Sequence, residues 1–502
     1  MILSIDQGTT GTTVTLVDQT GRVWAKVNEE YPQIYPQPSW VEHDPEAIWR
    51  SVLSCIKRAL AQAQAQGAKE ASIAAIGITN QRETVVLWER ETGRPVANAI
   101  VWQCRRTADF CDTLKKKKLG PTLAKKTGLV IDPYFSASKL RWLLKNVSGA
   151  EKRARSGQLA AGTIDSFLIW RLSGGMVHRT DVTNASRTQL MNIHSGQWDS
   201  DLLKIFSVPS SILPEISPSN GVLAVTKNVP GLPDGIPISG VAGDQQAALF
   251  GQTCFKPGQA KCTFGTGSFI LLNTGSQAPK SKKGILTTVA WQLAQDKKMT
   301  YALEGGAFIC GAAVQWLRDE LGFIKESREV EELAGQVADS GGVEFVPALA
   351  GLGAPYWDPH ARGLITGLTR GSNRAHIARA TLEAMALQNV EILLAMQSES
   401  KTKLRTLRVD GGAVNNNLLM QIQADYLGVE IERPQMVETT ALGAAYLAGL
   451  GVGFWADKGE LTKIWQVDRS FKVKMRAAER KRRLESWRLA VARTLFPSRV
   501  RF

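Results

Sequence analysis

Two segments far apart in the chain follow the same plan of strand, turn and strand, and this repetition constrains the fold more than any other feature. Residues 2–22 hold an apolar run, a Gly/Thr turn that follows Asp6, a second apolar run and a further polar turn. Residues 260–275 repeat this order with a Gly/Thr turn of their own. Apolar runs joined by such short turns are typical of β-hairpins. The repetition predicts a duplicated domain, each copy opening with a hairpin whose turn faces a shared cleft.

The first turn, Gly8-Thr9-Thr10-Gly11, allows two interpretations. An ordinary hairpin connection uses glycine and small polar residues. A phosphate cradle uses the same residues, because glycine lets the backbone approach an anion while N–H groups and Thr hydroxyls donate to its oxygens. No Gly-Lys-Ser/Thr follows the turn, and a strand comes next where a dinucleotide-binding turn would have a helix. The sequence therefore excludes a P-loop and a Rossmann turn.

The bulk properties indicate a folded protein of two large domains. A chain of 502 residues is too long for one usual domain, and its 44% hydrophobic and 21% charged residues are typical of soluble proteins. The six cysteines form no CxxC pair and the five histidines are scattered, so we expect a reduced, cytosolic protein without structural zinc. An acidic residue at position 6 argues against a signal peptide.

The longest uncharged run, residues 441–456, is too short and too rich in glycine to predict a transmembrane segment. It is better explained as a small-residue helix packed closely inside a domain. The net charge of +15 raises nucleic acid as a partner, but residues 471–502 alone contribute +9. Apolar residues interleave with the basic ones there, which predicts an amphipathic terminal helix with a solvated basic face. We therefore expect no nucleic-acid partner, and an anionic surface is the alternative.

The first half of the chain alternates patterns typical of strands and of helices. We expect strands at 2–5, 14–17, 22–27, 73–79 and 84–88, and helices at 45–66 and 104–117.

Two later segments place chemically useful residues where a strand ends. The apolar run 237–243 ends before Asp244, which either caps the following helix or acts as a general base beside a phosphate. The run 407–410 ends in Gly411-Gly412, where close strand–helix packing or a flat ligand against the backbone would each require glycine.

Polar and aromatic residues of the first half suggest a small polyol site. Arg82 and Glu83 lie in a polar loop between two apolar strands. They form a solvated turn, or they bind vicinal hydroxyls, one donating and one accepting. Trp102 and Tyr134 are core aromatics, or they line the polyol through its C–H faces. Together these residues describe a polyhydroxylated substrate next to a nucleotide phosphate.

With these segments in view, the sequence resembles the FGGY carbohydrate kinases. Residues 134–146 (YFSASKLRWLLKN) are similar to the first family signature, and residues 363–383 (GLITGLTRGSNRAHIARATLE) to the second. Further segments resemble the members that phosphorylate glycerol: WVEHDP (40–45), ITNQRET (78–84), NAIVWQCRRT (98–107), GLVIDPYFS (128–136), GDQQAALFGQ (243–252) and GLGAPYWDP (351–359). The similarity extends from residue 2 to about 456.

The resemblance implies an α/β fold of two ribonuclease-H-like (actin-like ATPase) domains around a central nucleotide and substrate cleft. The expected domains are residues 1–247 and 248–502, the second ending in the basic tail. The implied reaction is the phosphorylation of glycerol to sn-glycerol 3-phosphate by ATP with Mg²⁺, in a cytoplasmic homodimer or homotetramer. The first turn would then be a phosphate cradle. The alternatives are a kinase for another small polyol or ketose, and a non-catalytic ATP-binding protein of the same fold.

The family pattern also implies roles for single residues. Asp6 and Asp244 would hold Mg²⁺, and Asp244 would be the catalytic base. The glycerol-binding positions would be Arg82, Glu83, Trp102, Tyr134, Asp244, Gln245 and Phe269. The ATP-binding positions would be Gly8, Thr9, Thr10, Gly265, Thr266, Gly311, Gln315, Gly411, Gly412 and Asn416. One position departs from the pattern, because Thr13 stands where the family usually carries an Arg near the phosphates.

Overall fold

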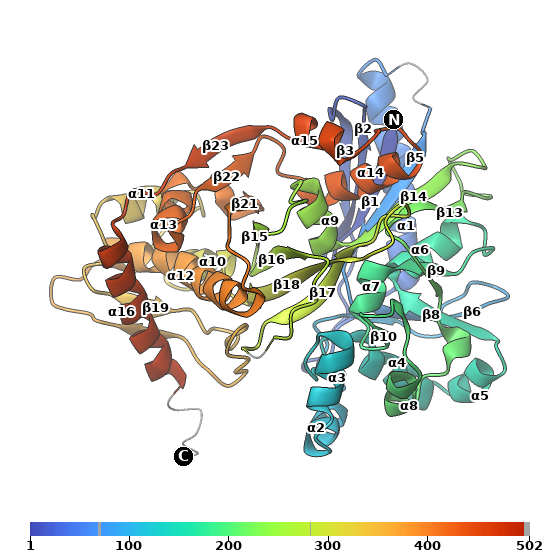
Figure 1. Cartoon of the computed structure of the whole chain (residues 1–502), viewed down its shortest axis with the longest axis horizontal. Helices are drawn as coiled ribbons and strands as arrows, with labels where there is room; N and C mark the ends of the chain where they lie inside the picture. The colour runs from blue at the N-terminus through green and yellow to red at the C-terminus, as the bar shows by residue number, and fades with distance from the viewer. Residues whose placement is uncertain (69–71, 282, 496–502) are drawn as a thin grey trace.

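The computed structural model describes residues 1–68, 72–281 and 283–495 (Figure 1). The first half of the chain is built on a six-stranded sheet in the order β13-β14-β5-β1-β2-β3. Its strands are β1 (Ile2–Gln7), β2 (Gly11–Val17), β3 (Val23–Glu30), β5 (Ala75–Asn80), β13 (Asn220–Val225) and β14 (Pro237–Gly243). β1 and β2 form an antiparallel hairpin, whereas β5 pairs in parallel with both β1 and β14.

The second half is built on a seven-stranded sheet in the order β17-β18-β16-β15-β21-β22-β23. Its strands are β15 (Gln259–Phe264), β16 (Ser268–Gly275), β17 (Leu286–Trp291), β18 (Thr300–Ala307), β21 (Thr406–Asp410), β22 (Ile431–Pro434) and β23 (Val467–Phe471). Here too the opening hairpin, β15–β16, is antiparallel, and the next strands on its β15 side, β21 and β22, are parallel. The two sheets share one plan, which confirms the duplication predicted from the sequence.

Smaller elements complete both halves. The first half adds a four-stranded sheet of β4 (Glu42–His43), β7 (Ala99–Ile100), β6 (Val85–Glu89) and β8 (Leu159–Thr163), and the pairs β9 (Arg179–Asp181) with β12 (Glu215–Ser217) and β10 (Met191–Asn192) with β11 (Gln197–Trp198). Its helices are α1 (Pro45–Ala65), α2 (Ala108–Lys116), α3 (Gly120–Thr127), α4 (Ser136–Asn146), α5 (Ala150–Arg155), α6 (Ile164–Leu172), α7 (Val182–Ser186), α8 (Ser200–Phe206), α9 (Asp244–Gly251) and the 3-10 turn η1 (Ser210–Ile212).

The second half adds one more strand pair, β19 (Glu344–Val346) with β20 (Leu364–Thr366). Its helices are α10 (Gly311–Asp319), α11 (Glu329–Gly335), α12 (Arg374–Ser400), α13 (Asn417–Leu427), α14 (Thr439–Gly451), α15 (Lys458–Ile464), α16 (Ala477–Leu495) and the 3-10 turn η2 (Gly412–Asn415).

The predicted elements of the first half are present, with small shifts at their ends. The expected strands are β1, β2, β3, β5 and β6, and the expected helices are α1 and α2. α1 begins as the sequence indicates, because Asp44 accepts a hydrogen bond from the Glu46 N–H and Pro45 occupies the first helical position. α2 begins at Ala108 rather than at residue 104, because residues before it form turns closed by bonds such as Cys104 N–H to the Val101 oxygen (3.0 Å).

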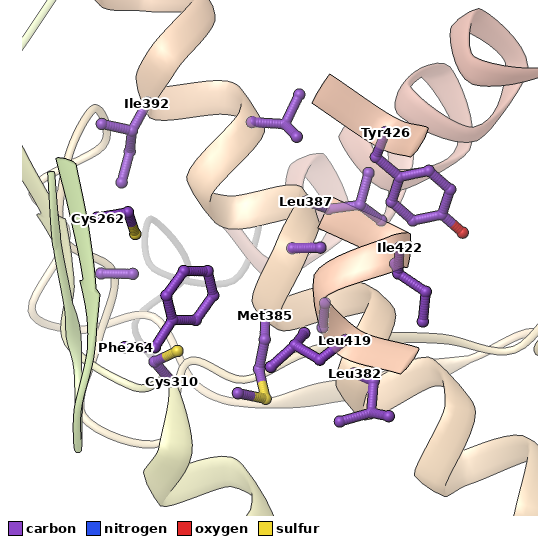
Figure 2. Close-up of a cluster of buried hydrophobic side chains, with 14 of the residues drawn as sticks. Cys262, Phe264, Cys310, Leu382, Met385, Leu387, Ile392, Leu419, Ile422 and Tyr426 are labelled. Atoms are coloured by element: carbon purple, nitrogen blue, oxygen red, sulfur yellow. The ribbon is translucent and has the colours of Figure 1, made fainter. Parts of the chain in front are cut away.

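The long helix α12 is central to the second half. Figure 2 shows its side chains Leu382, Met385, Leu387 and Ile392 within one buried apolar cluster. On one side of this helix lie two residues of the sheet, Cys262 and Phe264. On the other side lie three residues of α13, Leu419, Ile422 and Tyr426. Because neighbours cover α12 on several sides, its buried positions run all round the helix and do not form a single stripe.

Helix α14 follows the parallel strands of the second sheet in the chain, yet it packs against β1, β5, β14 and α9 of the first half (Figure 1). Small residues allow this close approach. A Cβ added to Gly77 would lie 2.3 Å from the Ala444 oxygen, and one added to Gly443 would lie 1.8 Å from the Ala247 oxygen. The prediction of a closely packed small-residue helix is confirmed. Among the described residues, no helix has the length and apolar character needed to cross a membrane.

The basic tail forms the predicted amphipathic helix over its described part, α16, while residues 496–502 lie outside the described residues. Trp487 is buried and donates to Glu391 at 2.8 Å. The expectation of a solvated basic face is wrong for Arg483, which forms ion pairs with Glu344 (2.9 Å) and Glu383 (2.5 Å). Both carboxylates are buried, so this cation fastens the tail to its own domain.

Replacement of the helical glycine of α14, Gly443→Ala, should lower the melting temperature, since the new methyl group would overlap the backbone of α9. Overpacking of this kind costs about 1–3 kcal/mol. The matched control is Gly335→Ala at the end of α11, where an added Cβ meets no neighbouring atom within 4 Å. Equal melting temperatures for the two variants would contradict the close packing of α14.

Candidate active site

The first hairpin turn is held by an aromatic side chain behind it. The Tyr31 hydroxyl contacts the Gly8 oxygen at 2.5 Å and the Thr9 oxygen at 2.9 Å, and Gln7 donates to Tyr31 at 2.7 Å. Trp102 Nε1 donates to the Thr9 hydroxyl at 2.9 Å, while Thr10 is exposed. Thr9 and Trp102, predicted for ATP and for the polyol respectively, therefore lie in direct contact.

Two carboxylates gather beside this turn. Asp6 lies near the end of β1, and Asp244 opens α9 where β14 ends. Burial, together with the charges of Asp244 and Glu438, raises the pKa of Asp6 to about 7 against an opposing effect of Lys26. Repulsion between the two carboxylates is costly, and a divalent cation held by both of them would relieve that cost.

The donor set fits Mg²⁺ bound together with a nucleotide. Among the described residues no group of three or more His, Cys, Asp or Glu forms a self-sufficient metal site. Mg²⁺ typically uses one or two carboxylates and completes its shell with phosphates and water. The pair Asp6 and Asp244 meets that requirement.

The loop after β5 is not a solvated turn. Arg82 is 3% exposed and Glu83 is 1% exposed. The guanidinium of Arg82 contacts Glu304 through two bonds, Nη1 to Oε2 at 2.7 Å and Nη2 to Oε1 at 2.8 Å, and its Nε lies 3.1 Å from Asp244 Oδ1. Arg187 Nε donates to Glu83 Oε1 at 2.7 Å. The interpretation as a solvated turn is therefore wrong, and the binding of vicinal hydroxyls by Arg82 and Glu83 stays a prediction.

Glu304 is ionised in this setting. Burial acts to raise the pKa of Glu304, but Arg187 and Arg82 outweigh burial and lower it to about 2. The carboxylate therefore stays charged through the physiological range, and the two arginines keep a shared counter-charge.

Aromatic rings surround this charged group. Trp102 and Tyr134 meet edge to face with ring centroids 5.5 Å apart, and the Arg187 guanidinium lies 5.9 Å from the Tyr134 ring centroid. Phe269 lies on β16 on the face of the second sheet that also carries Glu304. A Cβ on the paired Gly306 would lie 3.0 Å from the Phe269 ring, so this glycine leaves room for the ring.

The second hairpin turn joins the start of α10. Gly311 N–H donates to the Gly265 oxygen at 2.9 Å, and Cys310 N–H donates to the Thr266 oxygen at 2.8 Å. Gln315 is exposed one turn along this helix. Gly265, Thr266 and Gly311 are thus brought together, as expected for one nucleotide-binding surface.

The glycines after β21 have different surroundings. Gly411 has φ = +92° and an added Cβ would lie 2.6 Å from the Phe264 oxygen, whereas an added Cβ on Gly412 meets nothing within 4 Å. Close packing thus accounts for Gly411, and Gly412 faces open space. The Asn416 side chain accepts from the Leu419 N–H at 2.8 Å and caps α13.

A surface cavity of about 540 Å³ contains none of the predicted site residues. His194, Lys298 and Tyr301 are among the residues that line it. The candidate site is therefore identified by its chemistry and by the convergence of both halves on it.

Comparisons with known proteins decide the family. Models of the FGGY family of carbohydrate kinases match residues 1–251 (N-terminal domain) and 260–452 (C-terminal domain). The chain belongs to the FGGY family of carbohydrate kinases. Its two-domain fold is the one that the sequence predicted.

Similar proteins are glycerol kinases over nearly their whole length. The glycerol kinase of Bdellovibrio bacteriovorus is 61% identical over 98% of this chain and 99% of that protein. Glycerol kinase 2 of Thermotoga maritima is 55% identical, with 98% of each chain covered. The crystal structure of Plasmodium falciparum glycerol kinase with ADP superposes with a TM-score of 0.93 at 38% identity, covering 100% of this chain and 98% of that one.

Several residues of this FGGY kinase site escaped the sequence analysis. Lys261 is fully buried on β15, where burial lowers its pKa, and its Nζ contacts Gln245 and the Thr263 hydroxyl. Glu304 and Arg187 are buried as well. Lys261 and Glu304 each interrupt an apolar strand pattern, AKCTF and YALEG, and that interruption was an available signal. Arg187 carried no comparable signal. The individual ligand roles of the site residues stay predictions.

We expect the loss of the Tyr31 hydroxyl to weaken ATP binding in addition to lowering stability. In Tyr31→Phe the carbonyls of the kinase's first turn lose one of their side-chain donors, which we expect to raise KM for ATP several-fold and to cost about 1 kcal/mol of stability per lost bond.

The control is Tyr301→Phe, which removes one buried bond to the Ile193 oxygen (2.8 Å) away from the turn. Its stability should fall comparably while KM for ATP stays unchanged. If steady-state kinetics give both variants the same KM for ATP, the turn does not form part of the nucleotide site.

Proposed function

We propose that the protein transfers the terminal phosphoryl group of ATP to glycerol, with sn-glycerol 3-phosphate and ADP as products. The observation that carries the proposal is the position of Asp244. It opens α9, forms an ion pair with Arg82 at 3.1 Å and lies near enough to Asp6 for its charge to raise the pKa of that carboxyl. The near full-length similarity to proteins named glycerol kinase supports this choice of acceptor.

Asp244 would act as the general base. Its Oδ1 accepts from the Gln245 N–H at 2.6 Å and lies 3.1 Å from Arg82 Nε. These contacts orient the carboxylate, and we assign Oδ2 to the proton of the attacking hydroxyl. The side chain is 30% exposed, so a small substrate can reach it. A base within hydrogen-bond distance of the nucleophile typically contributes about 10²–10⁴-fold to the rate.

The polyol would be held by complementary groups. Glu83 accepts from one hydroxyl and Arg82 donates to its neighbour, while the rings of Trp102, Tyr134 and Phe269 cover the C–H faces. Two aromatic walls in edge-to-face contact favour a three-carbon chain over a longer ketose.

Phosphoryl transfer passes through a loose transition state with charge spread over the transferred oxygens. The turn at Gly8–Thr10 and the surface of Gly265, Thr266 and Gly311 would bind the nucleotide phosphates. Asp6 and Asp244 would hold Mg²⁺, which would supply positive charge to the phosphate oxygens. Cytoplasmic location and assembly as a homodimer or homotetramer are part of this proposal.

Asp244→Asn should remove the base while keeping the shape and the bond to the Gln245 N–H. We expect glycerol-dependent ADP release to fall about 10²-fold or more, with little loss of melting temperature. The assay compares glycerol with dihydroxyacetone, xylulose, ribulose and erythritol under Mg-ATP.

The control is Asp457→Asn, because Asp457 also stands at a helix start, where it caps α15 and accepts from the Gly459 N–H at 2.7 Å. Its activity should match the wild type. If another polyol is preferred over glycerol, the protein is a kinase for that substrate. If ATP binds but no polyol stimulates ADP release, a non-catalytic ATP-binding protein is favoured.

Thr13→Arg should raise kcat or tighten ATP binding. Thr13 pairs with Asp6 across the hairpin and its hydroxyl accepts from Asn28 at 3.0 Å, so an arginine there would add a cation at the phosphate side of the turn. Steady-state kinetics against Thr20→Arg, which adds the same charge in the turn beyond the other end of β2, separates a local from a general charge effect. Unchanged kinetics in Thr13→Arg would show that the position is idle in this chain.

A further inference from the structure

We propose that Glu304 is a positioning residue for the polyol site, holding Arg82 directly and Glu83 through Arg187. Glu304 lies on β18 of the second sheet, whereas Arg82, Glu83 and Arg187 belong to the first half. The side chains that would bind and position the polyol therefore come from both halves of the chain. The inference rests on the proposed phosphorylation of glycerol.

The four side chains form one continuous buried chain of ion pairs. Glu304 binds Arg82 by the two bonds of 2.7 and 2.8 Å, and its Oε1 also accepts from Arg187 Nη2 at 3.2 Å. Arg187 continues to Glu83 at 2.7 Å. The exposed fractions of the side chains are 2% for Arg82, 4% for Glu304, 0% for Arg187 and 1% for Glu83. Two cations and two anions balance, so the loss of Glu304 leaves an uncompensated buried cation.

The donors of Arg82 show what Glu304 fixes. A guanidinium has five N–H groups in a planar fork. Nε faces Asp244, Nη1 donates to Glu304 and Gln246, and Nη2 donates to Glu304. One N–H of Nη2 remains for a substrate hydroxyl. Without Glu304 the fork would turn toward Glu83 or Asp244 and occupy the carboxylate oxygens, Oε2 and Oδ2, that we assign to the substrate.

Glu83 is fixed in a complementary way. Its backbone has φ = +62°, an uncommon conformation for a residue with a side chain, and the surrounding structure must hold it there. The Ser136 hydroxyl donates to the Glu83 carbonyl oxygen at 3.1 Å, and Arg187 binds the side-chain Oε1. Oε2 is then directed to a ligand hydroxyl. Arg187 acts as a bridge, since among the described residues its Nη1 has no hydrogen-bond partner while Nε and Nη2 join Glu83 to Glu304.

Polar contacts next to this chain of ion pairs keep β17 and β18 against the first half. Thr288 of β17 bonds to Ser186 at 3.1 Å and to Gln246 at 3.3 Å. Because β17 pairs with β18, these contacts also fix the position from which the Glu304 carboxylate reaches Arg82. A shift of the second sheet would move both arginines together and so change glycerol binding.

The test is Glu304→Gln, which keeps the side-chain shape and removes its charge. We expect KM for glycerol to rise about 10-fold or more while KM for ATP changes less than about 2-fold. A purely structural defect would not produce this split. The control is Glu383→Gln, since Glu383 is also a buried glutamate of the second half held by two arginines, Arg379 (2.9 Å) and Arg483 (2.5 Å). Its two KM values should equal those of the wild type.

Arg187→Lys provides a second variant, because Glu304→Gln leaves a buried cation unpaired and endangers folding. Lysine keeps the charge but lacks the fork that joins Glu83 to Glu304, so KM for glycerol should again rise selectively. A folded variant of either kind with an unchanged KM for glycerol, or with equal rises for glycerol and ATP, overturns the inference. Glycerol-dependent ADP release by the wild-type protein tests the proposed function separately. If the wild type shows none, both proposals are overturned.

Discussion

The buried pairing of Glu304 with Arg82 and Arg187 is the interaction on which the candidate polyol site depends. Removing charges from water costs several kcal/mol per ion, and only good geometry with fully used donors offsets that cost. Here two carboxylates and two guanidiniums meet with exposed fractions of 4% or less. Such a group adds little net stability, but it permits one arrangement of its members. Its value lies in holding Arg82 and Glu83 ready for a ligand.

The duplicated halves have diverged around this group. Gly8-Thr9 and Gly265-Thr266 occupy the same place in the two hairpins, so Asp6 of the first corresponds to Thr263 of the second. The first half supplies the carboxylates Asp6 and Asp244. The second supplies the buried amine of Lys261, whose Nζ contacts Gln245 next to Asp244. One duplicated scaffold therefore carries different polar side chains in its two halves around one site.

Order in the chain and order in space differ where the halves meet. α14 follows β22 in sequence, yet it covers the first sheet because glycines and alanines let its backbone approach β5 and α9. The polar contacts of Thr288 add to this connection near the site. Because α14 crosses back in this way, it connects the second half of the chain to the sheet that carries the first hairpin.

The sequence by itself determined the duplicated hairpins, the main strands, the start of α1 and the residue types of the site, since turn chemistry and periodicity depend on near neighbours. It left open whether Arg82 and Glu83 were solvated, and it missed Lys261, Arg187 and Glu304. Those answers lie in contacts between distant segments, such as Arg82 with Glu304, which are 222 residues apart. Which charges face one another depends on how the two sheets meet, and only the tertiary structure decides that.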